Sequence, residues 1–187
     1  MKNNRNREYA FSETIASDEI KELRKRLNMT QKEFAALIRV SPKTVAKWEI
    51  SKEPVSGPIV MLCRLLWERP ETVDYYTVNK KEYPLRLKYY YKNILCTIID
   101  VNLIRRIVKI RNYTSDTLHC AFGRNLNPSF EEYMDFLRSR CFPESRDKMK
   151  IELNQLDIPY YDPLLIIQKT EGKMADDSFR IEIERGL

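Results

Sequence analysis

Polar side chains that donate hydrogen bonds are concentrated between residues 31 and 52. They are Gln31, Ser41, Lys43, Thr44, Lys47 and Lys52. Short hydroxyl side chains can approach the edges of base pairs in a major groove, whereas Lys and Gln can reach phosphates, and Lys can also reach guanine. The chemistry that these residue types predict is recognition of DNA.

Two short helices joined by a tight turn are expected to position these side chains. Thr30 and Glu33 have the spacing of a capping box, in which each side chain binds the other residue's backbone amide. Ser41 is a preferred N-cap, and Pro42 suits the first position of the second helix. Apolar residues at helical spacing predict the inward faces, which carry Phe34, Leu37, Ile38, Val45 and Trp48.

Further helices are expected on both sides of this pair. Ser17 is predicted to cap a helix over 18–28, Gly57 and Pro58 open another over 59–69, and a short turn begins at Pro70. The all-α module at 17–76 resembles the Xre/Cro class of helix-turn-helix repressors, and within it the antitoxins related to HigA and MqsA. The resemblance rests on T-Q-K-E-F-A at 30–35, V-S-P-K-T-V-A-K-W-E at 40–49 and P-V-S-G-P-I-V-M-L-C-R-L-L at 54–66.

The resemblance implies a homodimeric repressor of its own operon. The helix from Pro42 to Trp48 would then lie in the major groove. A twofold dimer implies an inverted-repeat operator in double-stranded DNA, with half-sites about one helical turn apart.

Basic residues are distributed unevenly along the chain. The 187 residues carry a net charge of +6, and residues 79–111 hold nine basic against two acidic side chains. This basic segment is either an extension of the DNA surface or the polar face of a sheet, where Lys and Arg discourage edge-to-edge aggregation. The sheet interpretation is favoured.

The four cysteines have no C-x-x-C spacing, and the chain contains one histidine. Buried free thiols are therefore expected, and neither a metal site nor a cofactor is predicted. No apolar run approaches the ~18 residues of a membrane span, and the polar N-terminus lacks a signal-peptide core. The sequence predicts a cytoplasmic protein without a membrane partner.

Residues 1–16 are predicted to be a flexible basic arm containing Lys2, Arg5 and Arg7. Such arms reach into minor grooves in some proteins, but an untethered terminus is the favoured interpretation. Residues 77–84 are expected to be a linker that ends at Pro84.

Residues 85–187 predict an α+β domain. Apolar, β-branched and aromatic residues favour strands at 85–91, 94–101 and 103–110, and a fourth strand or an extended crossover at 118–122. Helices are expected after Ser129, from Pro143 and after Pro163, and alternation at 179–183 predicts a closing strand. The predicted fold class is therefore an all-α helix-turn-helix bundle followed by a small antiparallel sheet with about three helices.

The C-terminal half weakly resembles the non-catalytic N-terminal subdomain of HipA-like toxin kinases. The resembling residues are K-N-I-L-C-T-I-I-D at 92–100, L-H-C-A-F-G at 118–123, R-C-F-P-E-S-R at 140–146 and L-D-I at 156–158. The kinase core is missing from the chain, because no Gly-rich loop or H-x-D motif is present. The resemblance implies a protein-binding domain.

Two side-chain groups allow a second interpretation. His119 and Cys120 are the residue types of a nucleophile and its base, but neighbours in a strand point to opposite faces, which argues against catalysis. The tyrosines at 89–91 could stack on bases, although alternate burial in a strand is favoured.

The sequence therefore predicts a sequence-specific autorepressor of antitoxin type, without enzymatic activity. Its C-terminal domain is expected to bind a protein partner, which would be a toxin or a defence effector. The alternative is a phage-encoded inhibitor of host defence, such as an anti-CRISPR, that represses its own operon through the helix-turn-helix.

Overall fold

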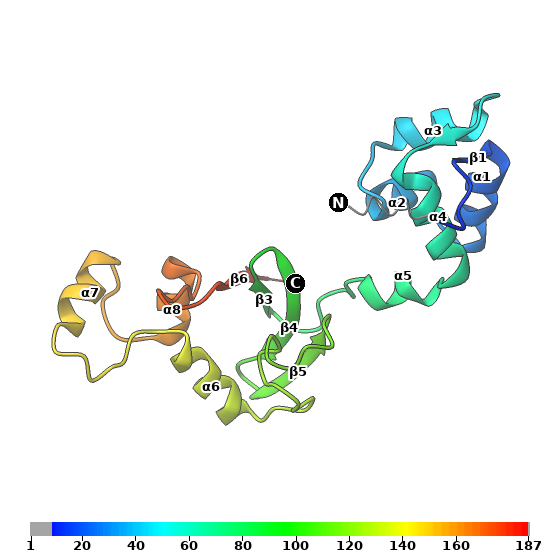
Figure 1. Cartoon of the computed structure of the whole chain (residues 1–187). Helices are drawn as coiled ribbons and strands as arrows, with labels where there is room; N and C mark the ends of the chain where they lie inside the picture. Colours follow the sequence, from blue (N-terminus) through cyan, green and yellow to red (C-terminus); the bar gives the residue numbers. More distant parts are fainter. Residues whose placement is uncertain (1–8, 187) are drawn as a thin grey trace, which may run out of the picture. The chain divides into compact units, whose positions relative to one another are not determined.

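The computed structural model describes residues 9–186. The chain forms two compact units that divide between Thr77 and Val78 (Figure 1). The N-terminal unit is helical, and the C-terminal unit combines a sheet with helices, so the predicted fold class is confirmed. Each unit has its own hydrophobic core.

Within residues 9–77, the N-terminal unit contains five helices and one short strand pair. The helices are α1 (Ser17–Arg26), α2 (Gln31–Leu37), α3 (Pro42–Ile50), α4 (Pro58–Glu68) and α5 (Glu71–Tyr76). Their shared core contains Ile20, Leu23, Phe34, Val45 and Leu66. Because α2 and α3 are each too short to be stable alone, their stability comes from this packing.

Local sequence signals set the ends of α2 and α3 as predicted. The Thr30 hydroxyl accepts from the Glu33 amide at 3.2 Å, and the Glu33 carboxylate accepts from the Thr30 amide at 2.7 Å. The Ser41 hydroxyl accepts from the Thr44 amide at 3.0 Å. Both helix starts are therefore fixed by residues next to them in sequence.

The start of α1 differs from the prediction. Ala16 is the N-cap, and its amide is bound by the Glu19 carboxylate at 2.8 Å. Ser17 is the first helical residue instead, because its hydroxyl donates to the Ser51 carbonyl. The Ser17 side chain, which the local pattern predicts as the cap of α1, makes a contact with a distant residue instead.

Part of the predicted arm belongs to the N-terminal unit. β1 (Thr14–Ile15) pairs with β2 (Val55–Ser56) in antiparallel orientation. Lys2, Arg5 and Arg7 lie outside the described residues. The strand pair fixes residues 14 and 15 beside the segment that follows α3.

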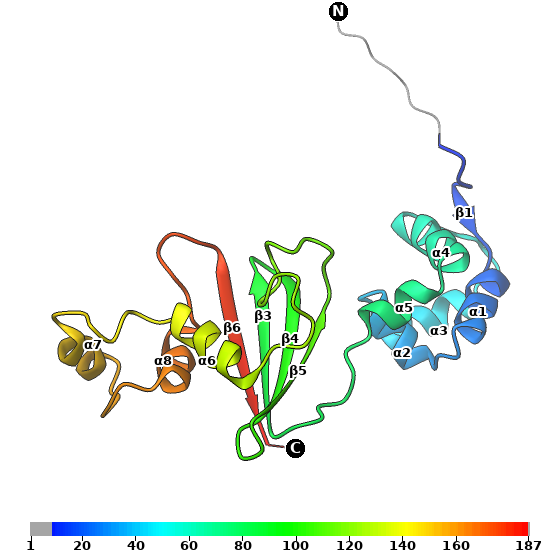
Figure 2. The same cartoon turned by 90° about the horizontal axis from the view of Figure 1, so that it is seen from below.

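A four-stranded antiparallel sheet forms the centre of the C-terminal unit. Its order is β5-β4-β3-β6, with β3 (Leu85–Tyr91), β4 (Ile94–Asn102), β5 (Ile107–Asn112) and β6 (Phe179–Arg185). The helices α6 (Phe130–Ser139), α7 (Met149–Gln155) and α8 (Pro163–Thr170) gather on one side of the sheet (Figure 2).

Alternation along β3 separates a core face from a polar face. Leu85, Leu87 and Tyr89 are buried beneath the helices, and the Tyr89 ring stacks on Phe179 at 4.9 Å between ring centroids. Tyr90 lies under the guanidinium of Arg180. The expected alternate burial of the tyrosines is thus observed, and Tyr89 is part of the core.

Three predicted elements of this unit are displaced. The strand expected at 103–110 begins only at Ile107, because residues 103–106 form the turn, in which the Asn102 side chain accepts from the Arg105 amide at 3.0 Å. Residues 118–122 form turns and contain no strand. Successive tight turns follow Pro143, so α7 starts at Met149.

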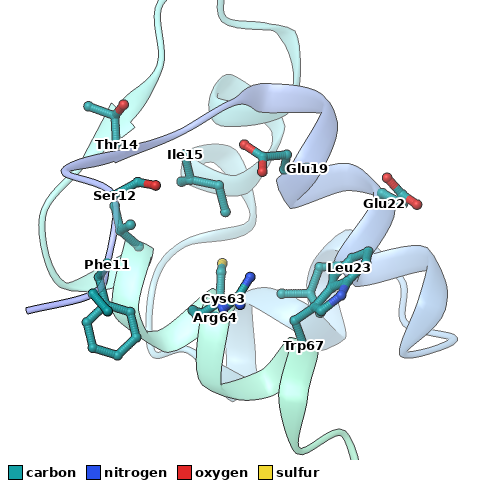
Figure 3. Close-up of a pocket in the computed structure, with 12 residues that line it drawn as sticks. Phe11, Ser12, Thr14, Ile15, Glu19, Glu22, Leu23, Cys63, Arg64 and Trp67 are labelled. Atoms are coloured by element: carbon teal, nitrogen blue, oxygen red, sulfur yellow. The ribbon is translucent and has the colours of Figure 1, made fainter.

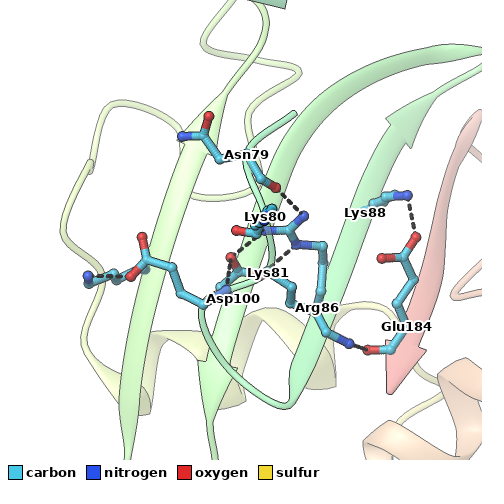
Figure 4. Close-up of polar contacts among 9 residues, drawn as sticks. Asn79, Lys80, Lys81, Arg86, Lys88, Asp100 and Glu184 are labelled. Atoms are coloured by element: carbon cyan, nitrogen blue, oxygen red, sulfur yellow. Dashed lines mark hydrogen bonds and ion pairs between the residues drawn. The ribbon is translucent and has the colours of Figure 1, made fainter. Parts of the chain in front are cut away.

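A segment within the predicted linker lies against the polar face of the sheet. We call residues 79–82 the strap. The Arg86 guanidinium donates to the Asn79 carbonyl at 2.8 Å and to the Lys80 carbonyl at 3.2 Å, while it forms two bonds of 2.6 Å to the Asp100 carboxylate (Figure 4). Glu82 pairs with Lys109. The strap is therefore attached to the C-terminal unit.

Replacing Arg86 should release the strap. We expect Arg86→Leu to destabilise the C-terminal unit by about 3 kcal/mol or more, because Asp100 would remain buried without its partner. Tryptic cleavage after Lys80 and Lys81 should accelerate, as measured by mass spectrometry. Lys88→Leu is the control, because Lys88 pairs with the partly exposed Glu184. Equal cleavage rates in Arg86→Leu and the unaltered protein would show that Arg86 does not hold the strap to the sheet.

Candidate nucleic-acid interface

The helix α3 presents a row of polar side chains to solvent. Ser41, Lys43 and Lys47 are exposed, and Thr44 is half-buried. The Ser41 and Thr44 hydroxyls lie 2.8 Å apart, so the start of α3 carries a fixed pair of hydroxyls. Val45 is fully buried on the opposite side. This arrangement matches a helix whose outer face is available to a major groove.

Among the described residues, Lys43, Lys47 and Lys52 take part in no ion pair. Lys52 is exposed just after the end of α3, whose C-cap is Ser51. Three uncompensated ammonium groups therefore lie along α3 and the residues that follow it. Such cations attract a phosphate backbone without specifying its sequence.

Gln31 makes an internal contact. Its side-chain amide nitrogen donates to the Glu49 carboxylate at 2.8 Å. Gln31 lies in the first turn of α2, and Glu49 lies near the end of α3. The contact links the two helices of the helix-turn-helix and gives Gln31 a positioning role, and its contact with a phosphate stays a prediction.

A buried ion pair fixes α3 against α1. The Arg24 side chain binds both carboxylate oxygens of Glu49, at 2.6 and 3.0 Å, and donates to the Met29 carbonyl at 2.8 Å. The Glu49 side chain is only 3% exposed. Sequence reasoning did not identify this pair, although each member lies four residues after a buried apolar residue, Ile20 and Val45.

The ion pair shifts the pKa values of both Arg24 and Glu49. The hydrogen bond from Arg24 holds the pKa of Glu49 below its usual value of 4.5, although burial alone would raise it. The same hydrogen bond raises the pKa of Arg24. Both groups are therefore charged at neutral pH, and each stabilises the charge of the other.

The basic segment at 79–111 is largely compensated within the C-terminal unit. Four of its cations form the ion pairs Arg86–Asp100, Lys88–Glu184, Arg106–Glu131 and Lys109–Glu82. Lys92 and Arg111 lie near the rings of Tyr91 and Tyr113. These contacts favour the interpretation of the segment as the polar side of the sheet.

A cavity of about 460 Å³ opens between residues 10–15, α1 and α4 (Figure 3). Ile15, Leu23 and Cys63 line it, and Glu19 and Glu22 lie along α1 at its side. The carboxylates would repel phosphates, so we do not expect this side of the N-terminal unit to contact DNA. Burial raises the pKa of the Cys63 thiol to about 11, which keeps it protonated.

His119 and Cys120 do not form a nucleophile pair. Nδ1 of His119 lies 3.1 Å from the Asp116 carboxylate, and its ring stacks on Tyr91. The Cys120 thiol is directed at the carbonyls of Thr114 and Asp116, and burial raises its pKa. A raised pKa suppresses the reactive thiolate.

Residues 9–186 contain no group of three or more His, Cys, Asp or Glu side chains arranged to hold a metal ion. In the same range no helix combines the length and the apolar character that a membrane crossing requires.

The N-terminal unit contains a helix-turn-helix domain. Residues 20–62 match the helix-turn-helix family. A curated relative is the antitoxin HigA-2 of Vibrio cholerae serotype O1 (strain ATCC 39315 / El Tor Inaba N16961), which is 34% identical over 61 residues. The match covers 33% of this chain and 59% of the relative, so the chain spans less than two thirds of the relative's length. The family match covers α2 and α3, which carry the polar row.

The Arg24–Glu49 pair should make the stability of the N-terminal unit depend on pH. Because Glu49 has a lowered pKa, its stabilising contribution is complete above pH 4.5 and is lost as the pH falls through the pKa of the folded state. We expect Glu49→Gln to be less stable at pH 7 and to lack this acid-dependent loss.

Urea unfolding followed by tryptophan fluorescence measures this effect selectively. Both tryptophans, Trp48 and Trp67, lie in the N-terminal unit. Glu68→Gln is the matched control, because the Arg64–Glu68 pair is exposed. The same acid-dependent loss in Glu49→Gln and in the unaltered protein would contradict the role of Glu49.

Proposed function

We propose that the protein is a DNA-binding transcriptional repressor of antitoxin type, with α3 as its recognition helix. The observation that carries the proposal is the polar row of Ser41, Lys43, Thr44 and Lys47 on a helix whose orientation is fixed by a buried ion pair. Hydroxyls at the start of α3 reach base edges, and the lysines reach phosphates or guanine. Gln31 and Lys52 flank this contact surface.

We further propose that the protein binds its operator as a homodimer. Met61 and Leu65 lie one turn apart on α4 and are 51% and 43% exposed, which leaves an apolar strip on the N-terminal unit. A second copy that covers this strip would present two α3 helices to DNA. The operator would then be an inverted repeat.

The C-terminal unit is proposed to bind a protein partner. The similarity of the N-terminal part to an antitoxin supports a toxin as that partner, and repression would then be autoregulatory. A defence effector is the alternative partner. Isolation of the complex formed with the product of the neighbouring gene would distinguish the two.

Removing a lysine from α3 should weaken DNA binding and reduce its dependence on salt. In a gel-shift titration on the DNA upstream of the gene, we expect Lys47→Ala to lower the slope of log affinity against log salt by about 1, because one phosphate contact is lost. Thr44→Ala should instead relax sequence preference, by roughly 1–3 kcal/mol at one base pair.

Lys173→Ala is the control for the gel shift. Lys173 is exposed and lies in the C-terminal unit, where it pairs with Glu171. The control should bind like the unaltered protein. No shift of the upstream DNA at low salt, or equal salt slopes for Lys47→Ala and the unaltered protein, would overturn the assignment of α3.

A further inference from the structure

The turn that joins α2 to α3 contains a residue in the left-handed conformation. Arg39 has a φ of 60°, and the amide of the next residue, Val40, donates to the Ala35 carbonyl at 3.0 Å. This bond belongs to a Schellman motif, which ends a helix at a left-handed residue that is usually glycine. The helices α1 and α7 end in the same way, with Asn28 and Asp157 at the left-handed position. Asn and Asp visit this conformation routinely, whereas Arg has no such advantage.

Within residues 9–186, Arg39 differs from the other non-glycine residues that have a positive φ. Besides Asn28 and Asp157, these residues have side-chain partners: Lys92 lies near the Tyr91 ring, Arg106 pairs with Glu131, and Glu171 pairs with Lys173. Arg39 is exposed, and its guanidinium makes no hydrogen bond, ion pair or ring contact in the same range. A strained residue whose side chain has no partner within the fold points to a role in binding.

Stabilisation of the α2 dipole is the alternative explanation for an arginine at this position. A cation near the C-terminus of a helix is favourable, and the last turn of α2 contains no basic residue. The dipole acts on the isolated protein, whereas a contact with a ligand acts only in the complex. The two explanations therefore predict different effects of Arg39 on DNA binding.

Arg39 lies close to the proposed DNA-binding surface. It precedes Ser41, where the polar row of α3 begins, by two residues, so the two Cα atoms are at most about 7 Å apart. Arg39 belongs to the turn and not to α3. When a recognition helix occupies a major groove, residues beside the helix meet the phosphates that border the groove. A guanidinium suits this position, because its fork of N–H donors matches two phosphate oxygens.

We propose that Arg39 binds a DNA phosphate next to the N-terminal end of α3. Within residues 9–186, Arg39 joins Lys43, Lys47 and Lys52 as a cation without an ion pair, and the four extend from the turn before α3 to the residues after it. Arg39 adds affinity and helps to fix the register of α3 on the duplex, and it does not read a base. The proposal rests on the proposed role of α3 as the recognition helix.

The test compares Arg39→Gly and Arg39→Gln with the unaltered full chain in gel-shift titrations on the upstream DNA. Each change should lower the slope of log affinity against log salt by about 1 and weaken binding about tenfold, because one charge-assisted phosphate contact is lost. The loss should be the same on upstream DNA that carries single base-pair changes, since a phosphate contact carries no sequence information. Unchanged affinity, or a loss that depends on one base pair, would overturn the proposal.

Urea unfolding distinguishes the phosphate contact from the dipole explanation. Arg39→Gly should unfold at a urea concentration no lower than the unaltered protein, because glycine adopts the left-handed conformation without steric cost. A stable variant that binds DNA weakly would show that the side chain acts in the complex. A lower unfolding midpoint together with unchanged DNA affinity would assign Arg39 to the α2 dipole and overturn the proposal.

Lys92→Gly is the matched control. Lys92 is also an exposed cation in the left-handed conformation, with a φ of 53°, but it lies in the C-terminal unit. The control therefore makes the same change of backbone type and of net charge, and it should bind DNA like the unaltered protein. A loss of affinity in Lys92→Gly equal to that in Arg39→Gly would overturn the proposal, because net charge alone would then account for the effect.

Failure of the Arg39 contact is distinguishable from failure of the proposed function. If the unaltered chain does not shift the upstream DNA at low salt, the proposed DNA-binding function fails. A shift whose salt slope falls in Lys47→Ala but not in the Arg39 variants would retain α3 as the recognition helix and reject only the Arg39 contact.

Discussion

The buried pair of Arg24 and Glu49 is the constraint on which the proposed DNA-binding surface depends. Two charges removed from water are tolerated only when each meets the other in good geometry, and here the Arg24 side chain binds both carboxylate oxygens. Gln31 adds a third contact to the same carboxylate. Apolar packing around Val45 tolerates some rotation of α3, whereas a directional ion pair does not. The pair therefore adds a directional contact to the apolar packing that orients α3.

Buried arginines play a similar part in the C-terminal unit. Arg86 joins Asp100 to two carbonyls of the strap, and Arg140 binds the Gly172 carbonyl and the Asp177 carboxylate. Each guanidinium satisfies backbone carbonyls of an irregular segment and a carboxylate at the same time. The irregular segment before β3 is thereby held to the sheet, and the one before β6 is held to the end of α6.

Features that depend on neighbouring residues could be predicted from the sequence, and features that depend on distant residues could not. The capping box at Thr30, the N-cap at Ser41 and the alternation in β3 and β6 are local, and the structure has them as expected. The apolar character of Leu103 and Ile104 predicts a strand, yet both residues lie in a turn and Ile104 is 96% exposed. Arg24 and Glu49 are 25 residues apart in the sequence, so no local sequence pattern predicts their contact.

Selection of binding sites from random double-stranded DNA tests the central claim most directly. Repeated selection with the full chain should converge on an inverted repeat whose half-sites are centred about one helical turn apart. The selected site should bind at least about a thousandfold more tightly than unrelated DNA at physiological salt, and Glu49→Gln should reduce this preference. Failure to converge on any sequence, or equal affinity for selected and unrelated DNA, would contradict the assignment of α3 as a recognition helix.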